Sequence, residues 1–167
     1  MSFQSRIRNT CLVLALGLTV ATAASAQAGT AKGTLTYTKG SATLTNAYLV
    51  KGPDSFDATK MIRKLIFSPT DIGAKILACT TLSCVEGGLD AGLTVELDAG
   101  PRLNYWMVLN NQLVQYSGTQ EPTALQKTAD DAKHLAGKLA FDASAAGGPK
   151  VDVVFDAPLV KEFTKAR

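Results

Sequence analysis

The sequence predicts a mainly β protein, an antiparallel β-sandwich or a partly open β-barrel of about eight strands with one short helix. Apolar and polar residues alternate in most segments, as they do in strands that bury one face. Glycine, proline and asparagine break these segments at short intervals. No repeat of about 20 to 50 residues runs through the chain. Periodicity alone does not separate a sandwich from a barrel.

The first two strands are expected to form a hairpin. Leu35 and Tyr37 alternate with threonines, and residues 39–41 (Lys-Gly-Ser) suit a tight turn. Apolar residues resume over 44–50, and Gly-Pro-Asp-Ser at 52–55 ends the pattern.

A further strand and the one helix are predicted next. Residues 62–67 read as a strand. Ser-Pro-Thr-Asp at 68–71 offers a turn and a helix cap, and Ile72, Ile76 and Cys79 then fall on one helical face.

The middle of the chain predicts an antiparallel meander. Residues 93–97 alternate, residues 99–101 (Ala-Gly-Pro) break the pattern, and residues 103–109 alternate again. The asparagines at 110–111 tolerate positive φ and can turn the chain into a strand over 113–116.

The last third is predicted to hold one irregular region and two strands. Residues 117–131 are polar and without clear alternation, which predicts a long loop or an irregular edge. Residues 135–141 and 151–155 read as strands joined by a flexible connection, and Pro158 is expected to end the second.

The N-terminus has the order of a cleaved signal peptide over residues 1–26. Two arginines precede an apolar run at 11–20, and small residues end in Ala-Ser-Ala at 24–26. The run is shorter than the about 20 residues that span a bilayer, which argues against a membrane anchor. Cleavage after Ala26 is preferred, and cleavage after Ala28 also fits.

The mature chain is predicted to be a single β-rich domain, residues 27–167, in the periplasm or the medium. Removing two arginines lowers the formal net charge from +3 to +1, which excludes a nucleic-acid partner on charge grounds. The mature chain has no second apolar stretch long enough for stable membrane insertion.

Cys79 and Cys84 are the two cysteines left after cleavage, and they are expected to form a disulfide. A metal site would need further histidine or cysteine ligands nearby. A redox motif normally has two intervening residues, whereas four separate these cysteines.

The sequence indicates no catalytic set, no metal site and no cofactor. His134 is the only histidine and is expected at the surface or an edge. Paired carboxylates could run hydrolytic chemistry. The candidate pairs are Asp54 with Asp57, Asp130 with Asp131, and Asp152 with Asp156.

Three aromatic residues, Tyr105, Trp106 and Tyr116, form the candidate binding surface, because amphipathic aromatics are common in recognition surfaces. The alternative is that they cover the core or fill a groove between sheets.

The chain resembles a loose group of small exported bacterial β-domain proteins without an assigned activity. The resemblance lies in residues 33–35 (Gly-Thr-Leu), 46–48 (Asn-Ala-Tyr), 53–57 (Pro-Asp-Ser-Phe-Asp), 137–139 (Gly-Lys-Leu) and 153–158 (Val-Val-Phe-Asp-Ala-Pro). It implies an exported β fold and no catalytic residue.

The leading functional hypothesis is a non-enzymatic binding protein that recognises a protein partner in the cell envelope or medium. An immunity or inhibitor protein is one concrete version. The alternatives are a carrier of a small apolar ligand in a barrel interior and an envelope hydrolase that uses paired carboxylates.

Overall fold

The computed structural model describes residues 27–167. The predicted signal peptide, residues 1–26, lies outside the described residues.

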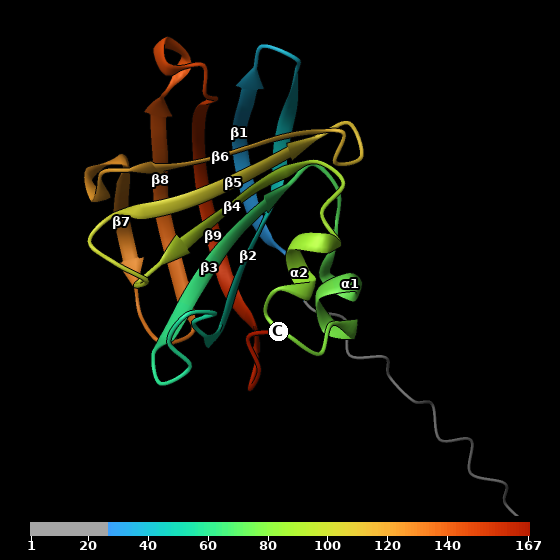
Figure 1. The fold of residues 1–167 in the computed structure, drawn as a ribbon, viewed down its shortest axis with the longest axis vertical. Coiled ribbons are helices and arrows are strands. Elements are labelled where there is room, and N and C mark those ends of the chain that lie inside the picture. Colours follow the sequence, from blue (N-terminus) through green and yellow to red (C-terminus); the bar gives the residue numbers. More distant parts are fainter. Residues whose placement is uncertain (1–26) are drawn as a thin grey trace, which may run out of the picture.

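Nine strands of the described chain form one sheet in the order β6-β5-β4-β3-β2-β1-β9-β8-β7, with neighbouring strands antiparallel (Figure 1). The strands are β1 (Gly29–Tyr37), β2 (Gly40–Pro53), β3 (Met61–Ser68), β4 (Gly92–Leu97), β5 (Leu103–Leu109), β6 (Val114–Gln120), β7 (Leu125–Asp130), β8 (His134–Asp142) and β9 (Lys150–Glu162). Two short helices, α1 (Gly73–Ala78) and α2 (Cys84–Gly87), lie between β3 and β4. Two 3-10 turns are η1 (Pro122–Ala124) and η2 (Ser144–Ala146).

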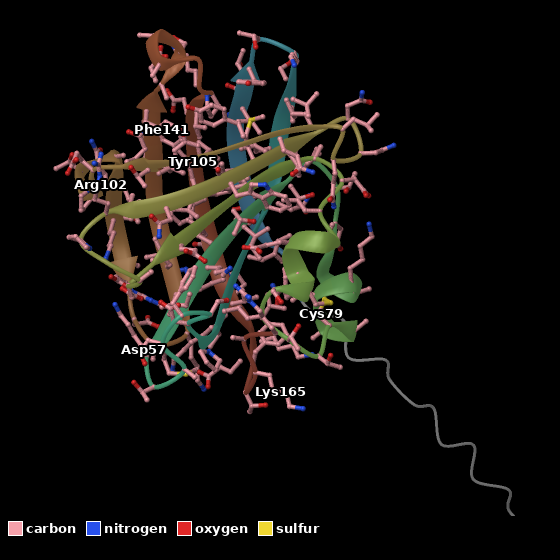
Figure 2. The ribbon with its side chains drawn as sticks, viewed as in Figure 1. Asp57, Cys79, Arg102, Tyr105, Phe141 and Lys165 are labelled. Carbon is pink, nitrogen blue, oxygen red and sulfur yellow. A yellow bond between two sulfur atoms is a disulfide. The ribbon has the colours of Figure 1, made fainter. Side chains whose placement is uncertain are left out.

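The sheet curls so that strands far apart in its order face each other (Figure 1). The ring centroids of Tyr105 on β5 and Phe141 on β8 are 4.9 Å apart, and both residues lie where β5 crosses β8 (Figure 2). Arg63 on β3 donates hydrogen bonds to Asp98 at 2.7 Å and to Asp130 on β7 at 2.5 Å. The two end strands, β6 and β7, are joined by η1 but do not pair with each other in the described chain, so the curled sheet is a partly open barrel.

The inner face of the curl carries the main core. Its members are the inward-facing residues predicted by alternation, for example Leu93, Val95 and Leu97 on β4. Phe67 on β3 is fully buried and packs edge-on against Phe155 on β9, with ring centroids 5.3 Å apart. Aliphatic and aromatic side chains from all nine strands therefore fill the inside of the curl.

The two helices cover part of the outer face. A second buried cluster includes Ile62 and Ile66 of β3, Ile76 of α1, Val85 of α2 and Phe163 after β9. This cluster holds the helices against the sheet.

A tyrosine anchors the start of α1 to the sheet. The hydroxyl of Tyr48 donates to Asp71 Oδ1 at 2.7 Å and accepts the Ile72 N–H at 2.9 Å. The N-cap residue of α1 is Ile72, which makes no side-chain cap bond, so the cap predicted within 68–71 is wrong by one residue; Asp71, just before it, accepts the Gly73 N–H at 2.8 Å. Burial, followed by the bond to Asp71, raises the pKa of Tyr48 above its ordinary value.

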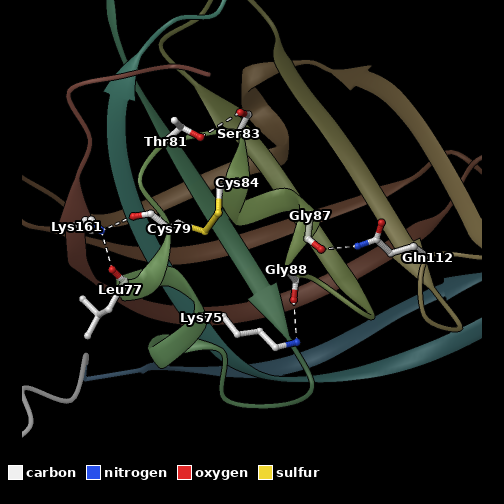
Figure 3. The surroundings of a disulfide bond; sticks show 10 residues. All are labelled: Lys75, Leu77, Cys79, Thr81, Ser83, Cys84, Gly87, Gly88, Gln112 and Lys161. Atoms are coloured by element: carbon white, nitrogen blue, oxygen red, sulfur yellow. Dashed lines mark hydrogen bonds between the residues drawn. A yellow bond between two sulfur atoms is a disulfide. The ribbon is translucent and has the colours of Figure 1, made fainter.

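Cys79 and Cys84 form the predicted disulfide, with Cα atoms 5.6 Å apart, between the end of α1 and the start of α2 (Figure 3). Lys161 of β9 donates to the carbonyls of Leu77 at 2.7 Å and Cys79 at 2.5 Å. The disulfide is consistent with an oxidising compartment.

The predicted fold class is confirmed. Residues 117–131 include β7, a bulged edge strand, in agreement with the irregular edge that was one of the two alternatives. Two local expectations change. The four-residue helix α2 adds to the one predicted helix. Pro158 does not end the last strand, because β9 moves beyond β1 there and pairs in parallel with β2 through Glu162.

Asn110 and Asn111 both have φ of 52°, so the predicted turn between β5 and β6 is confirmed. None of the helices within 27–167 is both long and apolar enough to cross a membrane.

Candidate functional site

Two rows of cross-strand neighbours carry polar residues over the outer face of β3, β4 and β5. In one row Lys64 pairs with Glu96, which pairs with Asn104. In the next row Thr94 lies opposite Trp106. Side chains two apart on a strand share a face, so the four residues from β4 and β5 lie together on this face. Glu86 of α2 reaches the same place through its contact with Lys64.

Lys64 is the charged centre of this group and is only 4% exposed. Its Nζ lies 2.6 Å from Glu86 Oε1 and 2.9 Å from Glu96 Oε1. Burial acts to lower the pKa of Lys64, but the attraction of the two carboxylates, Glu86 first, outweighs burial and raises it above the ordinary value. Lys64 is therefore a protonated counter-ion and unsuited to act as a base or nucleophile.

Thr94 lies beside these charges and is 1% exposed. Its Oγ1 is buried and has no hydrogen-bond partner among the described residues. Most buried hydroxyls in folded proteins have a partner, so an unpaired one requires an explanation. Here the residue also lines a pocket.

The pocket has a volume of about 150 Å³ and is half open to solvent. It is lined by Glu86, Thr94, Glu96, Asn104, Tyr105 and Trp106. Asn104 Nδ2 donates a hydrogen bond to Glu96 Oε2 at 3.3 Å, which holds these two lining side chains together. The half-buried indole of Trp106 adds a flat aromatic group. We call these residues with Lys64 the outer pocket. The outer pocket can accept hydrogen bonds and stack on a planar group.

The three aromatic residues predicted as a binding surface fall on two faces. Tyr105 and Tyr116 point into the curl, where their rings stack with centroids 6.2 Å apart. Burial raises the pKa of the Tyr105 hydroxyl. Tyr105 and Trp106 both line the outer pocket, but of the three aromatic side chains only that of Trp106 lies on the outer face.

The predicted carboxylate pairs are each held by local partners. Asp54 and Asp57 accept backbone N–H groups of their own loop, and so does Asp131. Asp130 bonds Arg63 and Lys127, whose contacts hold its pKa below the ordinary value. Asp152 pairs with Lys138 at 3.0 Å.

His134, the first residue of β8, lies 2.8 Å from Asp156 through Nε2 and is partly exposed, in agreement with the predicted edge or surface position. Within residues 27–167 no group of three or more potential ligands is placed to hold a metal ion.

Sequence reasoning missed Lys64, Glu86, Thr94 and Glu96. The sequence does give one indication of Lys64. It is two residues from both Ile62 and Ile66 on β3, so it shares a face of the strand with these buried residues. Glu86 could not be found this way, since its place depends on how α2 packs over β3.

Comparison with known proteins gives no relative: no protein-family model, no curated protein and no solved structure matches the chain.

Proposed function

We propose that this protein is a non-enzymatic binding protein of the periplasm or the medium that recognises a protein partner through the outer pocket. The observation that carries the proposal is the buried, unpartnered Thr94 hydroxyl in a half-open pocket beside Trp106. An unpaired buried polar group requires an explanation, and a partner that enters the pocket can supply the missing hydrogen bond.

The size of the outer pocket favours a side chain of a protein over a free small molecule. Pockets that enclose drug-sized ligands have volumes of about 300–1,000 Å³. The outer pocket, at about 150 Å³, matches a single inserted side chain. Interface hot spots are commonly such anchors, and tryptophan is enriched among them.

The neighbouring sheet edge supports the same class of partner. In the described part of the chain β6 has a strand on one side only, and its seven residues include no charge and no proline. In natural proteins, charged residues or proline usually protect an edge strand from pairing with another chain. Ser117 and Thr119 of β6 lie opposite Trp106 and Asn104, so an extended segment added to β6 would run beside the outer pocket.

The biological role that fits this arrangement is an immunity or inhibitor protein that neutralises an envelope-acting toxin or hydrolase. Its support is the disulfide, which suggests an oxidising compartment such as the periplasm or the medium. The ionised Lys64 suits recognition, because it holds Glu86 and Glu96 in place.

The test is capture of a stoichiometric partner from envelope extracts of the host by the mature protein. Trp106→Ala should reduce capture at least about tenfold, since truncating a hot-spot residue costs about 2 kcal/mol or more. The matched control is Val154→Ala, which removes an exposed apolar side chain from β9 and should leave capture unchanged.

A photo-crosslinking amino acid in place of Thr119 should join the partner to the edge of β6, whereas the same group at position 154 should not. Equal capture by wild type and Trp106→Ala, or crosslinking at position 154 alone, contradicts the proposal.

A second candidate function, carriage of a small apolar ligand, has one observation in its favour. An open pocket of about 260 Å³ lies between the end of β1 and η2, beside Tyr37 and Gly148. It lies at the rim, because side chains fill the interior. Native mass spectrometry of protein from its host should then show a bound small molecule, which the leading proposal does not predict.

A further inference from the structure

The charges around the outer pocket leave it with an excess of negative charge. Two carboxylates, Glu86 and Glu96, face one cation, Lys64. Lys64 contacts one oxygen of Glu86, and a carboxylate can accept further hydrogen bonds on its other oxygen. A cationic group entering the pocket would therefore be attracted, whereas an anion would be repelled.

The neutral groups of the outer pocket also select a hydrogen-bond donor. Thr94 Oγ1 is unpartnered among the described residues and can accept a bond. Asn104 uses its NH₂ group toward Glu96, so its carbonyl oxygen keeps accepting capacity. These acceptors come from two strands, and Glu86 comes from α2. The matching ligand carries several donors that point in different directions.

Trp106 adds a preference for a planar cation. Its indole is among the pocket-lining residues, and tryptophan is the strongest partner for a cation over an aromatic face. A guanidinium is flat, always charged and carries five N–H donors, whereas an ammonium is a compact charge that loses more hydration.

We infer that the outer pocket receives an arginine side chain of the protein partner, with its guanidinium on Trp106 and bonded to Glu86 and Thr94. This inference rests on the proposed function and names the chemistry that the partner presents.

Trp106 is the only tryptophan in the chain, so the intrinsic fluorescence and the indole N–H signal in an NMR spectrum both report this pocket. The probe is the peptide acetyl-Gly-Arg-Gly-amide, titrated into the mature, disulfide-bonded protein. Its matched control contains citrulline, which keeps the shape of arginine and removes the charge. We expect saturable binding of the arginine peptide and about tenfold weaker binding of the citrulline peptide.

Two variants test whether Glu86 is the carboxylate that binds the charge of the arginine peptide. Glu86→Gln should weaken the arginine peptide about tenfold. Asp90→Asn removes an exposed carboxylate just after α2, paired with Lys75, and should change binding less than twofold. Equal binding of the arginine and citrulline peptides contradicts the inference. So does equal binding of a lysine peptide, or an unchanged affinity in Glu86→Gln.

The outcome separates this inference from the proposed function. If the arginine peptide does not bind, while Trp106→Ala no longer captures the partner, the pocket binds a different side chain and only this inference is overturned. If Trp106→Ala keeps the partner and the peptide also fails, both are overturned.

Discussion

The two faces of β3, β4 and β5 differ sharply, although alternating residues of the same three strands form both of them. The inner side chains of β4, Leu93, Val95 and Leu97, are buried in a continuous apolar core. The outer side chains of the same strand are Thr94 and Glu96, which lie beside Lys64.

This difference underlies our proposal that the outer pocket serves recognition, while the inner face holds the fold together. Apolar burial on the inner face stabilises the sheet without specifying a ligand. A buried hydroxyl without a partner costs about 1–3 kcal/mol, and a buried lysine also carries a desolvation penalty. Natural sites retain such costs where a function requires them.

Phe67→Ala should give the largest loss of stability, because it empties the centre of the inner core. Phe67 is fully buried against Phe155, and Phe-to-Ala changes in cores cost about 3–5 kcal/mol. Urea unfolding measures the change. Val154→Ala, on an exposed position, should stay within about 0.5 kcal/mol of wild type. A loss below about 1 kcal/mol for Phe67→Ala would contradict the assignment of the inner face.

Lys64→Met should be the most destabilising change on the outer face, by about 3 kcal/mol, because it leaves Glu86 and Glu96 without their cation. The triple variant Lys64→Met, Glu86→Gln, Glu96→Gln should recover most of that loss in the same urea experiment. If the triple variant is less stable than Lys64→Met, the ion group contributes net stability, and the outer face then serves the fold as the inner face does.

The inner face could be predicted from the sequence, while the outer pocket could not. Alternation of period two marks Leu93, Val95 and Leu97 directly, since one strand contains the whole signal. The outer pocket combines β3, β4, β5 and α2, so its composition depends on strand register and on helix packing. Trp106 was predicted as a binding residue from its type, and alternation already places it on the opposite face from Tyr105. Its separation from Tyr116 depends on the register of β5 and β6, in which Tyr116 lies opposite Met107.

Removing the disulfide should destabilise the helices over the outer face. The double variant Cys79→Ser, Cys84→Ser should lose about 2 kcal/mol, because the bond closes a short loop. Amide hydrogen exchange should accelerate in α1 and α2 and stay slow in β9 and β1. Uniform acceleration across the sheet would show that the helices and the inner core do not unfold separately.

Acid should weaken the rim of the curl before it affects the inner core. Arg63, followed by Lys127, holds the pKa of Asp130 below its ordinary value. A depressed pKa contributes stability above the unfolded value, and this contribution is lost as the pH falls through the folded value. The urea midpoint should therefore decline below about pH 5. Asp130→Asn should make that decline shallower, and an unchanged slope would contradict the role of the Arg63 contact.

The most direct test of the contrast between the faces is to measure unfolding free energy and arginine-peptide affinity together in Thr94→Val. This change removes the unpartnered hydroxyl and keeps the side-chain shape. We expect a gain in stability of about 1 kcal/mol and a loss of peptide affinity of about fivefold or more. A variant that loses stability and binds as wild type would show that the Thr94 hydroxyl serves the fold, and would contradict the assignment of the outer pocket.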